Sequence, residues 1–261
     1  PEEFGRGHNT SRYHHSTTFP VYLLQLLHEK ELTTIASTPS STTYSFIVIL
    51  AGNNAITTTT TTTVHAQVLL LALAFSAVWS PQNCMAPNLT QMAAHFNFTP
   101  PQRDLFLGAH LAFATGVLSI PVSTAIGLIA DIVPSRKTLY ALTVALAGVS
   151  SLATASMTIT YTHLYLARFV TGGCMAGSLP IVFSLLGDYF DATDRDAASS
   201  GLTVSMDLGI LFGQLFAGIV GPTKGWQYPF LVCGCICIVT ALLVQLFVSV
   251  PKRGATAVAL Q

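Results

Sequence analysis

The chain has 261 residues, of which 8% are charged and 51% are hydrophobic. Ordinary soluble domains carry about 25% charged residues, so this composition argues against a soluble globular protein. The eleven basic and eleven acidic residues give a formal net charge of zero, which excludes a broad basic surface for nucleic acid.

The first 63 residues are rich in threonine, serine and histidine and end in an uninterrupted threonine run over 57–63. They show no sustained helical or strand periodicity, so we expect this low-complexity segment to be disordered. The first methionine of the chain is Met85, and Glu3-Phe4 is what a common cloning site encodes. We therefore expect part of the segment to be artefactual, the alternative being a native tail.

Six apolar stretches follow, separated by short polar loops. A helix of roughly 20 apolar residues covers the hydrocarbon core of a bilayer, which is about 30 Å thick. The sequence therefore predicts an all-α, polytopic membrane bundle of six transmembrane helices over 64–253, with a cytoplasmic linker beginning at 254–261. The predicted helices are Val64–Asn83, Leu105–Ala130, Thr138–Ile159, Leu164–Leu186, Ala198–Val220 and Phe230–Ser249.

The basic residues in the loops predict the orientation of these helices, because cytoplasmic loops are enriched in lysine and arginine. One side of the predicted bundle carries only Arg103 and Lys224. We therefore expect both termini to be cytoplasmic; which membrane holds the protein is left open. The basic residues of the opposite side are Arg136, Lys137, Arg195, Lys252 and Arg253.

The first predicted helix carries polar side chains at its carboxyl end. Trp79 and Asn83 lie on one face, with Gln82 beside them. A buried asparagine needs a hydrogen-bond partner, which here is either another helix or a bound ligand. Trp79 and Asn83 are therefore candidate solute contacts.

Two charged residues lie inside predicted helices, Arg168 in the fourth and Asp207 in the fifth. A charge in mid-membrane costs about 2.5–3.5 kcal/mol on insertion scales, so such residues usually serve a function. The functional interpretation is that both bind a solute or a coupling ion. The alternative is a buried ion pair that holds the fourth and fifth helices together.

The fifth helix has two contrasting faces. Asp207 and Gln214 follow one stripe, whereas Gly209, Gly213 and Ala217 follow the opposite one. Small residues at every fourth position allow another helix to approach closely. We predict that the glycine stripe packs against a helix and that Asp207 and Gln214 face a polar cavity.

No metal site, cofactor or catalytic group is predicted. Cys233, Cys235 and Cys237 are close in sequence, but Cys235 points away from the other two on a helix and no histidine lies nearby. Every histidine precedes the fourth predicted helix, the last being His163, so a serine–histidine pair across later helices is absent. The chain is therefore not expected to be an enzyme.

The loop between the second and third helices contains Gly127-x-x-x-Asp131 followed by Arg136-Lys137. This pattern resembles the signature that the major facilitator superfamily carries between helices 2 and 3. Within that family the sequence is most similar to Spinster-like members. The resemblance spans about 64–253 and includes Arg168 with Gly172-Gly173, Gly187-Asp188 with Arg195, and Gly225-Trp226 before the sixth helix.

The resemblance implies the amino-terminal half of a twelve-helix secondary transporter, built as two inverted three-helix repeats. The solute, a small organic molecule driven by its own gradient or by that of H⁺, would bind between this half and a missing carboxyl-terminal half. Arg168 would match the helix-4 arginine that couples to substrate or protons. Asp131 would match the carboxylate that contacts a helix end of the other half, and Arg136 and Lys137 the basic end of this gating loop.

Two departures from the family pattern are present. Ile132 follows Asp131 where the family usually has a basic residue, and Met175 occupies the place of a helix-4 glutamate in Spinster-like proteins. The second departure makes Asp207 the alternative carboxylate for proton coupling. A rival interpretation of the whole chain is a complete six-helix channel or homodimeric pore.

Overall fold

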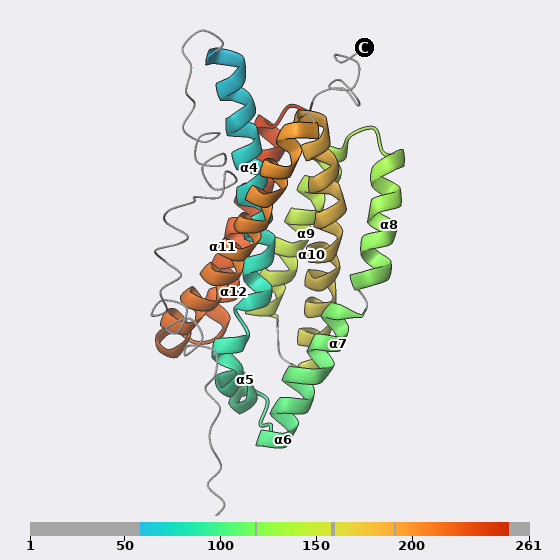
Figure 1. Cartoon of the computed structure of the whole chain (residues 1–261). Coiled ribbons are helices and arrows are strands. Elements are labelled where there is room, and N and C mark those ends of the chain that lie inside the picture. The colour runs from blue at the N-terminus through green and yellow to red at the C-terminus, as the bar shows by residue number, and fades with distance from the viewer. Residues whose placement is uncertain (1–57, 118, 158–159, 191, 251–261) are drawn as a thin grey trace, which may run out of the picture. The chain divides into compact units, whose positions relative to one another are not determined.

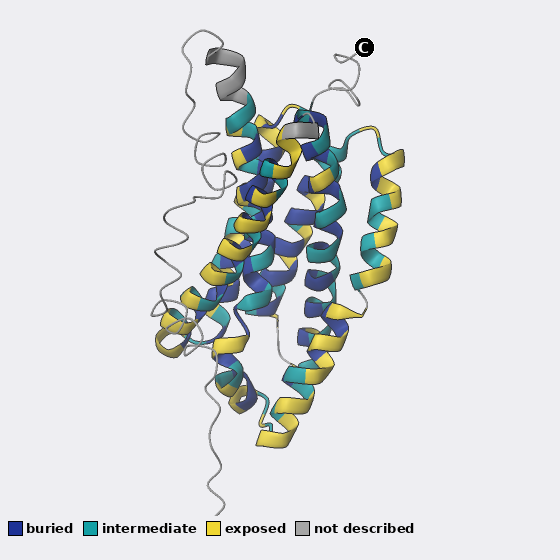
Figure 2. Ribbon diagram, in the orientation of Figure 1, coloured by how far each residue is buried: buried dark blue, intermediate teal, exposed yellow. Residues whose placement is uncertain are grey.

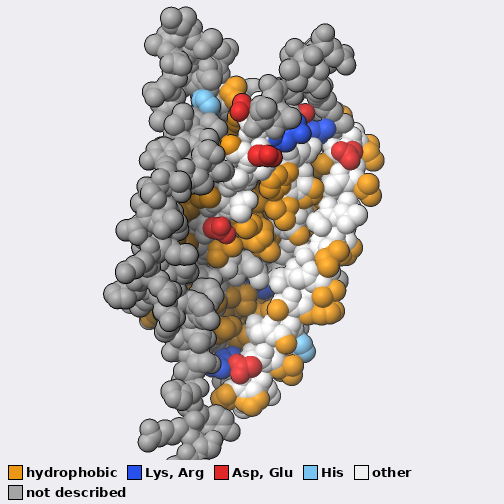
Figure 3. Space-filling view, in the orientation of Figure 1, with side chains coloured by type: hydrophobic (Ala, Val, Ile, Leu, Met, Phe, Trp, Pro, Cys, Tyr) orange, Lys and Arg blue, Asp and Glu red, His pale blue; other side chains and the backbone are white. Residues whose placement is uncertain are grey.

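The protein was analysed as a computed structural model, which describes residues 58–117, 119–157, 160–190 and 192–250. Within these residues, six helical stretches are long and apolar enough to cross a membrane, and no strand occurs (Figure 1). The all-α, six-span prediction is thereby confirmed. Figure 3 shows hydrophobic side chains over the middle of one face, with most of the visible charged side chains toward its ends.

Several of the spans contain more than one helical element. The first continues past α4 into two short helices, and the second begins with the short helix α6, which is followed by the π-helical segment η2. In chain order the elements are α4 (Thr58–Asn83), η1 (Ala86–Asn88), α5 (Leu89–His95), α6 (Pro100–Arg103), η2 (Asp104–His110), α7 (Leu111–Gly116), α8 (Ser119–Ile132), α9 (Arg136–Ser156), α10 (Tyr161–Tyr189), α11 (Ala192–Lys224) and α12 (Gln227–Phe247).

The structure differs from the predicted helix bounds at several helix ends, and α11, for example, begins at Ala192 and not at Ala198. Helix α4 begins at Thr58, six residues before the predicted start, since a formed helix extends by one hydrogen bond per added residue. The second span is not one continuous helix, because η2 and a break after α7 interrupt it. Residues 1–57 and the predicted linker at 254–261 lie outside the described residues.

The spans pack as a bundle with a shared apolar core. Helix α9 packs against α12, α4 against α11, and α10 against α4, α8 and α9. Helix α8 buries little of its surface, and its exposed side is visible in Figure 2. Two clusters of buried apolar residues lie inside the bundle, and the one that contains Trp226 and Phe230 includes residues of α5 and η2.

The glycine stripe of α11 packs against α4, as predicted. A side chain at Gly209 would meet the backbone carbonyl oxygen of Ser76, and one at Gly213 would meet that of Ser80. Ala217 is fully buried on the same stripe. Glycine is therefore needed here because the backbones of the two helices are in direct contact.

Pro81 breaks the hydrogen-bond ladder near the carboxyl end of α4. Proline has no N–H, so the carbonyl of Ala77 loses its normal helical donor. The hydroxyl of Ser80 donates to this oxygen at 3.0 Å, and the thiol of Cys237 in α12 donates to it at 3.1 Å. Side chains of two helices thus satisfy the free carbonyl and join α12 to α4.

Candidate functional site

Arg168 is fully buried, two turns into α10. Its guanidinium donates through Nη1 to the carbonyl of Pro81 at 3.1 Å and through Nη2 to the hydroxyl of Thr154 at 2.7 Å. Its central carbon lies 4.9 Å from the centre of the Phe230 ring. Four helices, α4, α9, α10 and α12, therefore surround one buried cation.

The end of α4 supplies part of the stabilisation that this charge needs. The last four carbonyls of a helix have no partner within it and carry the negative end of the helix dipole. The Pro81 carbonyl is one of them, and Arg168 satisfies it. The face of an aromatic ring is also attractive to a cation, which accounts for Phe230.

Arg168 lacks a carboxylate partner among the described residues. The salt bridges there join Arg103 to Asp104 and Arg136 to Asp188. In addition, the Nε of Arg168 is buried and has no hydrogen-bond partner within the described ranges. A buried polar atom of this kind is uncommon in proteins and marks a place where a ligand or water can bind.

The ion pair between Arg168 and Asp207 that the sequence allowed is not formed in the described structure. Arg168 points toward α4 and α9, whereas the side chain of Asp207 is exposed on α11. Gln214, two turns further along α11, is partly exposed. The two charges are separated because the buried face of α11 is its glycine stripe, opposite Asp207.

The polar end of α4 contributes further unpaired atoms. The indole Nε1 of Trp79 and the Oε1 of Gln82 are buried without a partner in the part of the chain that the structure describes. The ring of Trp79 packs edge-on against Phe75, while the amide of Asn83 donates to the Trp79 carbonyl at 2.9 Å. Asn83 therefore bonds its own helix, and Trp79 and Gln82 keep buried atoms available for a ligand.

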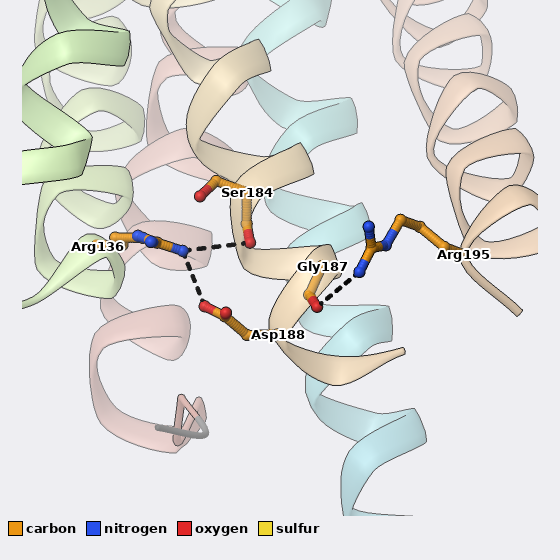
Figure 4. A network of polar contacts seen from close by, with 5 residues as sticks. All are labelled: Arg136, Ser184, Gly187, Asp188 and Arg195. Atoms are coloured by element: carbon orange, nitrogen blue, oxygen red, sulfur yellow. Dashed lines mark hydrogen bonds and ion pairs between the residues drawn. The ribbon is translucent and has the colours of Figure 1, made fainter. Parts of the chain in front are cut away.

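A second polar network joins the start of α9 to the end of α10. Arg136 donates to the carboxylate of Asp188 at 2.9 Å and to the carbonyl of Ser184 at 3.5 Å. Arg195, at the start of α11, donates to the carbonyl of Gly187 at 3.2 Å (Figure 4). The ion pair is largely buried, with 13% of the Arg136 side chain and 10% of the Asp188 side chain exposed.

The other residues of the predicted gating loop have different surroundings. Gly127 is half-buried in α8, where a side chain would meet Pro180 of α10 at 3.7 Å. Asp131 is exposed near the end of α8. Lys137 donates to the carbonyl of Gln245 in the last turn of α12 at 3.1 Å, which satisfies a free carbonyl at that helix end.

Sequence reasoning missed most of the partners of these residues. Thr154 and Pro81 carry no motif, and Asp188 appeared only as part of the family resemblance. Asp188 had one usable signal, because an acidic residue at the end of an apolar helix requires a basic partner when buried. Which basic residue that is depends on how α9 packs against α10.

We predict that Asp188→Asn destabilises the fold by about 3 kcal/mol, because it leaves the Arg136 guanidinium largely buried without its counter-ion. The measurement is the thermal unfolding of the purified protein in detergent. The matched control is Arg195→Gln, which removes one exposed bond to Gly187 and should change stability by less than about 1 kcal/mol. Equal melting temperatures for the two variants would contradict the prediction.

The family described as Major Facilitator Superfamily matches residues 67–260 of the chain. A search of the curated proteins found no match. Among solved structures, 27 chains match. Two of them are described as a bacterial homolog to the human lysosomal transporter Spinster, in inward-facing unoccupied and inward-facing occupied conformations.

Both solved structures have a TM-score of 0.63 and 18% sequence identity to this chain, which is a likeness of fold. The matches cover 74% and 72% of this chain but 44% of each solved chain. The chain therefore spans less than half the length of these structures.

Proposed function

The chain belongs to the Major Facilitator Superfamily, and on that premise we propose that it is the amino-terminal half of a secondary transporter. The complete protein moves a small organic solute across a membrane by alternating access, in which the binding site opens to one side at a time. Six apolar spans make the chain an integral, multi-pass membrane protein. The proposed partner is a second six-helix half that completes the solute path.

The observation that carries this proposal is the buried guanidinium of Arg168, which has no carboxylate partner among the described residues and an unpaired Nε. Trp79 and Gln82, on the neighbouring helix α4, add an unpaired donor and an unpaired acceptor. A solute with an acceptor oxygen, such as a carboxylate or phosphate, fits the donor at Arg168 and its positive charge. Arg136 also has an unpaired Nε but is paired with Asp188, so the absence of a carboxylate partner is what distinguishes Arg168.

The exposed stripe of α11 faces away from α4 and carries Asp207, with Gln214 beside it. An acidic side chain within a membrane span is costly against lipid, so it is expected to face a polar cavity. We place Asp207, Gln214, Asn83 and Trp79 with Arg168 along the solute path at the junction of the two halves. Asp207 is the proposed carboxylate for H⁺ coupling.

The gating loop is proposed to act at the cytoplasmic end, with both termini on that side. Asp131 lies exposed at the end of α8, where a carboxylate can bind the amino terminus of a helix in the second half. Arg136 and Lys137 hold the base of the loop to α10 and α12. Gly127 lies in α8 opposite Pro180 of α10, where a side chain would make an ordinary contact at 3.7 Å.

Uptake into lipid vesicles containing the complete transporter tests this function, with radiolabelled mono- and dicarboxylates as the probe panel. Alternating access predicts saturable uptake that is accelerated when unlabelled solute is present inside the vesicle. A channel would show neither saturation nor acceleration. If the protein transports a probe but unlabelled solute inside the vesicle does not accelerate its uptake, alternating access is wrong.

We predict that Asp207→Asn lowers H⁺-driven uptake by about tenfold or more, corresponding to ~1.4 kcal/mol, because the amide cannot take up a proton. The matched control is Asp196→Asn, which changes another exposed carboxylate of α11 near the helix start. The control should transport like the unmodified protein. Unchanged uptake in Asp207→Asn would remove this residue from the coupling mechanism.

A further inference from the structure

Cys84 and Cys233 lie 149 residues apart in sequence, yet their sulfur atoms are 3.5 Å apart. Cys84 directly follows α4, and Cys233 belongs to α12. Both residues are fully buried. The thiol of Cys84 also lies 3.3 Å from the carbonyl oxygen of Ser80. Two thiols from different helices thus face each other inside the bundle.

We propose that Cys84 and Cys233 are an oxidisable dithiol that closes into a disulfide between the end of α4 and α12. The oxidant is a small uncharged hydroperoxide, such as hydrogen peroxide. The two thiols together lose two protons and two electrons, and one S–S bond forms. With hydrogen peroxide, the O–O bond breaks, and its two oxygen atoms take up the two electrons and two protons and leave as two molecules of water.

The distance between the sulfur atoms favours this reaction. A disulfide bond is about 2.05 Å long, so the sulfurs must approach by about 1.5 Å to form one. The other cysteines are differently placed. Cys237 bonds the Ala77 carbonyl, Cys235 is exposed, and Cys174 belongs to the other apolar cluster.

The apolar surroundings of the two thiols determine which oxidants can reach them. Both thiols lie in the apolar cluster that contains Met85, Trp226 and Phe230. A charged reagent would have to enter this cluster without its hydration, which is costly. Oxidation is therefore expected with an uncharged, membrane-permeable peroxide and not with a charged thiol reagent.

The dithiol is adjacent to the site of Arg168. Arg168 lies against Phe230, which belongs to the same cluster as both cysteines. It also bonds the carbonyl of Pro81, three residues before Cys84. A disulfide would fix this end of α4 against α12. Oxidation is therefore expected to lower solute uptake. This effect on uptake rests on the proposed function, but the formation of the disulfide is independent of it.

The first test uses the complete protein in lipid vesicles, treated with hydrogen peroxide, then unfolded and alkylated with a maleimide. Peptide mass mapping should find Cys84 and Cys233 joined and lighter by two hydrogen atoms, while Cys174, Cys235 and Cys237 are alkylated. Dithiothreitol should restore both thiols. If Cys84 and Cys233 are alkylated after peroxide treatment, or if either pairs with another cysteine, the proposal is wrong.

Variants and uptake provide the second test. Cys84→Ser should leave Cys233 alkylated after peroxide treatment, whereas the matched control Cys235→Ser should still form the disulfide. The mapping of the unmodified protein decides the question even where Cys84→Ser fails to fold. If the disulfide forms but uptake is unchanged, the link to Arg168 is wrong. If the protein transports none of the probe solutes, the proposed function is wrong, but the thiol mapping still tests the disulfide.

Discussion

Arg168→Met in the complete transporter is expected to lower solute uptake by about 100-fold or more, corresponding to ~2.7 kcal/mol, while the protein stays folded. Methionine removes the positive charge and the donors that Arg168 offers to a solute. It also fills much of the same volume, so the cost in stability is limited to about 1–3 kcal/mol for the lost bonds to Pro81 and Thr154. Activity and stability should therefore separate in this variant.

The measurements are vesicle uptake of the carboxylate panel and thermal unfolding in detergent. Arg168→Lys is expected to lose uptake as well, because one ammonium cannot reproduce the planar fork that reaches Pro81 and Thr154. The matched control is Arg195→Met, which removes an exposed arginine that bonds Gly187. If Arg168→Met keeps normal uptake, Arg168 is only a cap for the end of α4.

Gly209→Leu is expected to prevent correct assembly of the bundle, at a cost of about 3 kcal/mol or more. A side chain at this position would meet the backbone carbonyl of Ser76, and a backbone atom in a packed helix cannot rotate away. Helix α11 would have to separate from α4 along the whole glycine stripe. The variant should unfold at a lower temperature and elute as aggregate in size-exclusion chromatography.

Gly218→Leu is the matched control on the same helix. Gly218 is exposed, and a side chain there would meet only Pro87 at an ordinary contact distance of 3.7 Å. Leucine also has a higher helix propensity than glycine, so this variant should be as stable as the unmodified protein. If both variants behave alike, close contact between α4 and α11 is not what requires glycine at Gly209.

The sequence predicted the residues of the candidate site better than it predicted their contacts. Arg168 was identifiable because a charge inside an apolar helix is conspicuous. Its acceptors were not identifiable, since Pro81 and Thr154 are 87 and 14 residues away and belong to other helices. The possible ion pair between Arg168 and Asp207 was inferred from the depths of the two residues in the membrane. Depth does not determine toward which helix a side chain points, and Asp207 points away from Arg168.

The sequence by itself determined the class of fold, the number of spans and the packing face of α11. Lipid permits few spanning structures, and both the length of an apolar helix and a stripe of small residues are local patterns. Only the tertiary structure decided that Arg136 pairs with Asp188, that Arg168 binds the end of α4 and that Cys84 faces Cys233. These contacts join side chains from different helices, so they depend on the rotation and depth of each helix in the bundle, which no local pattern encodes.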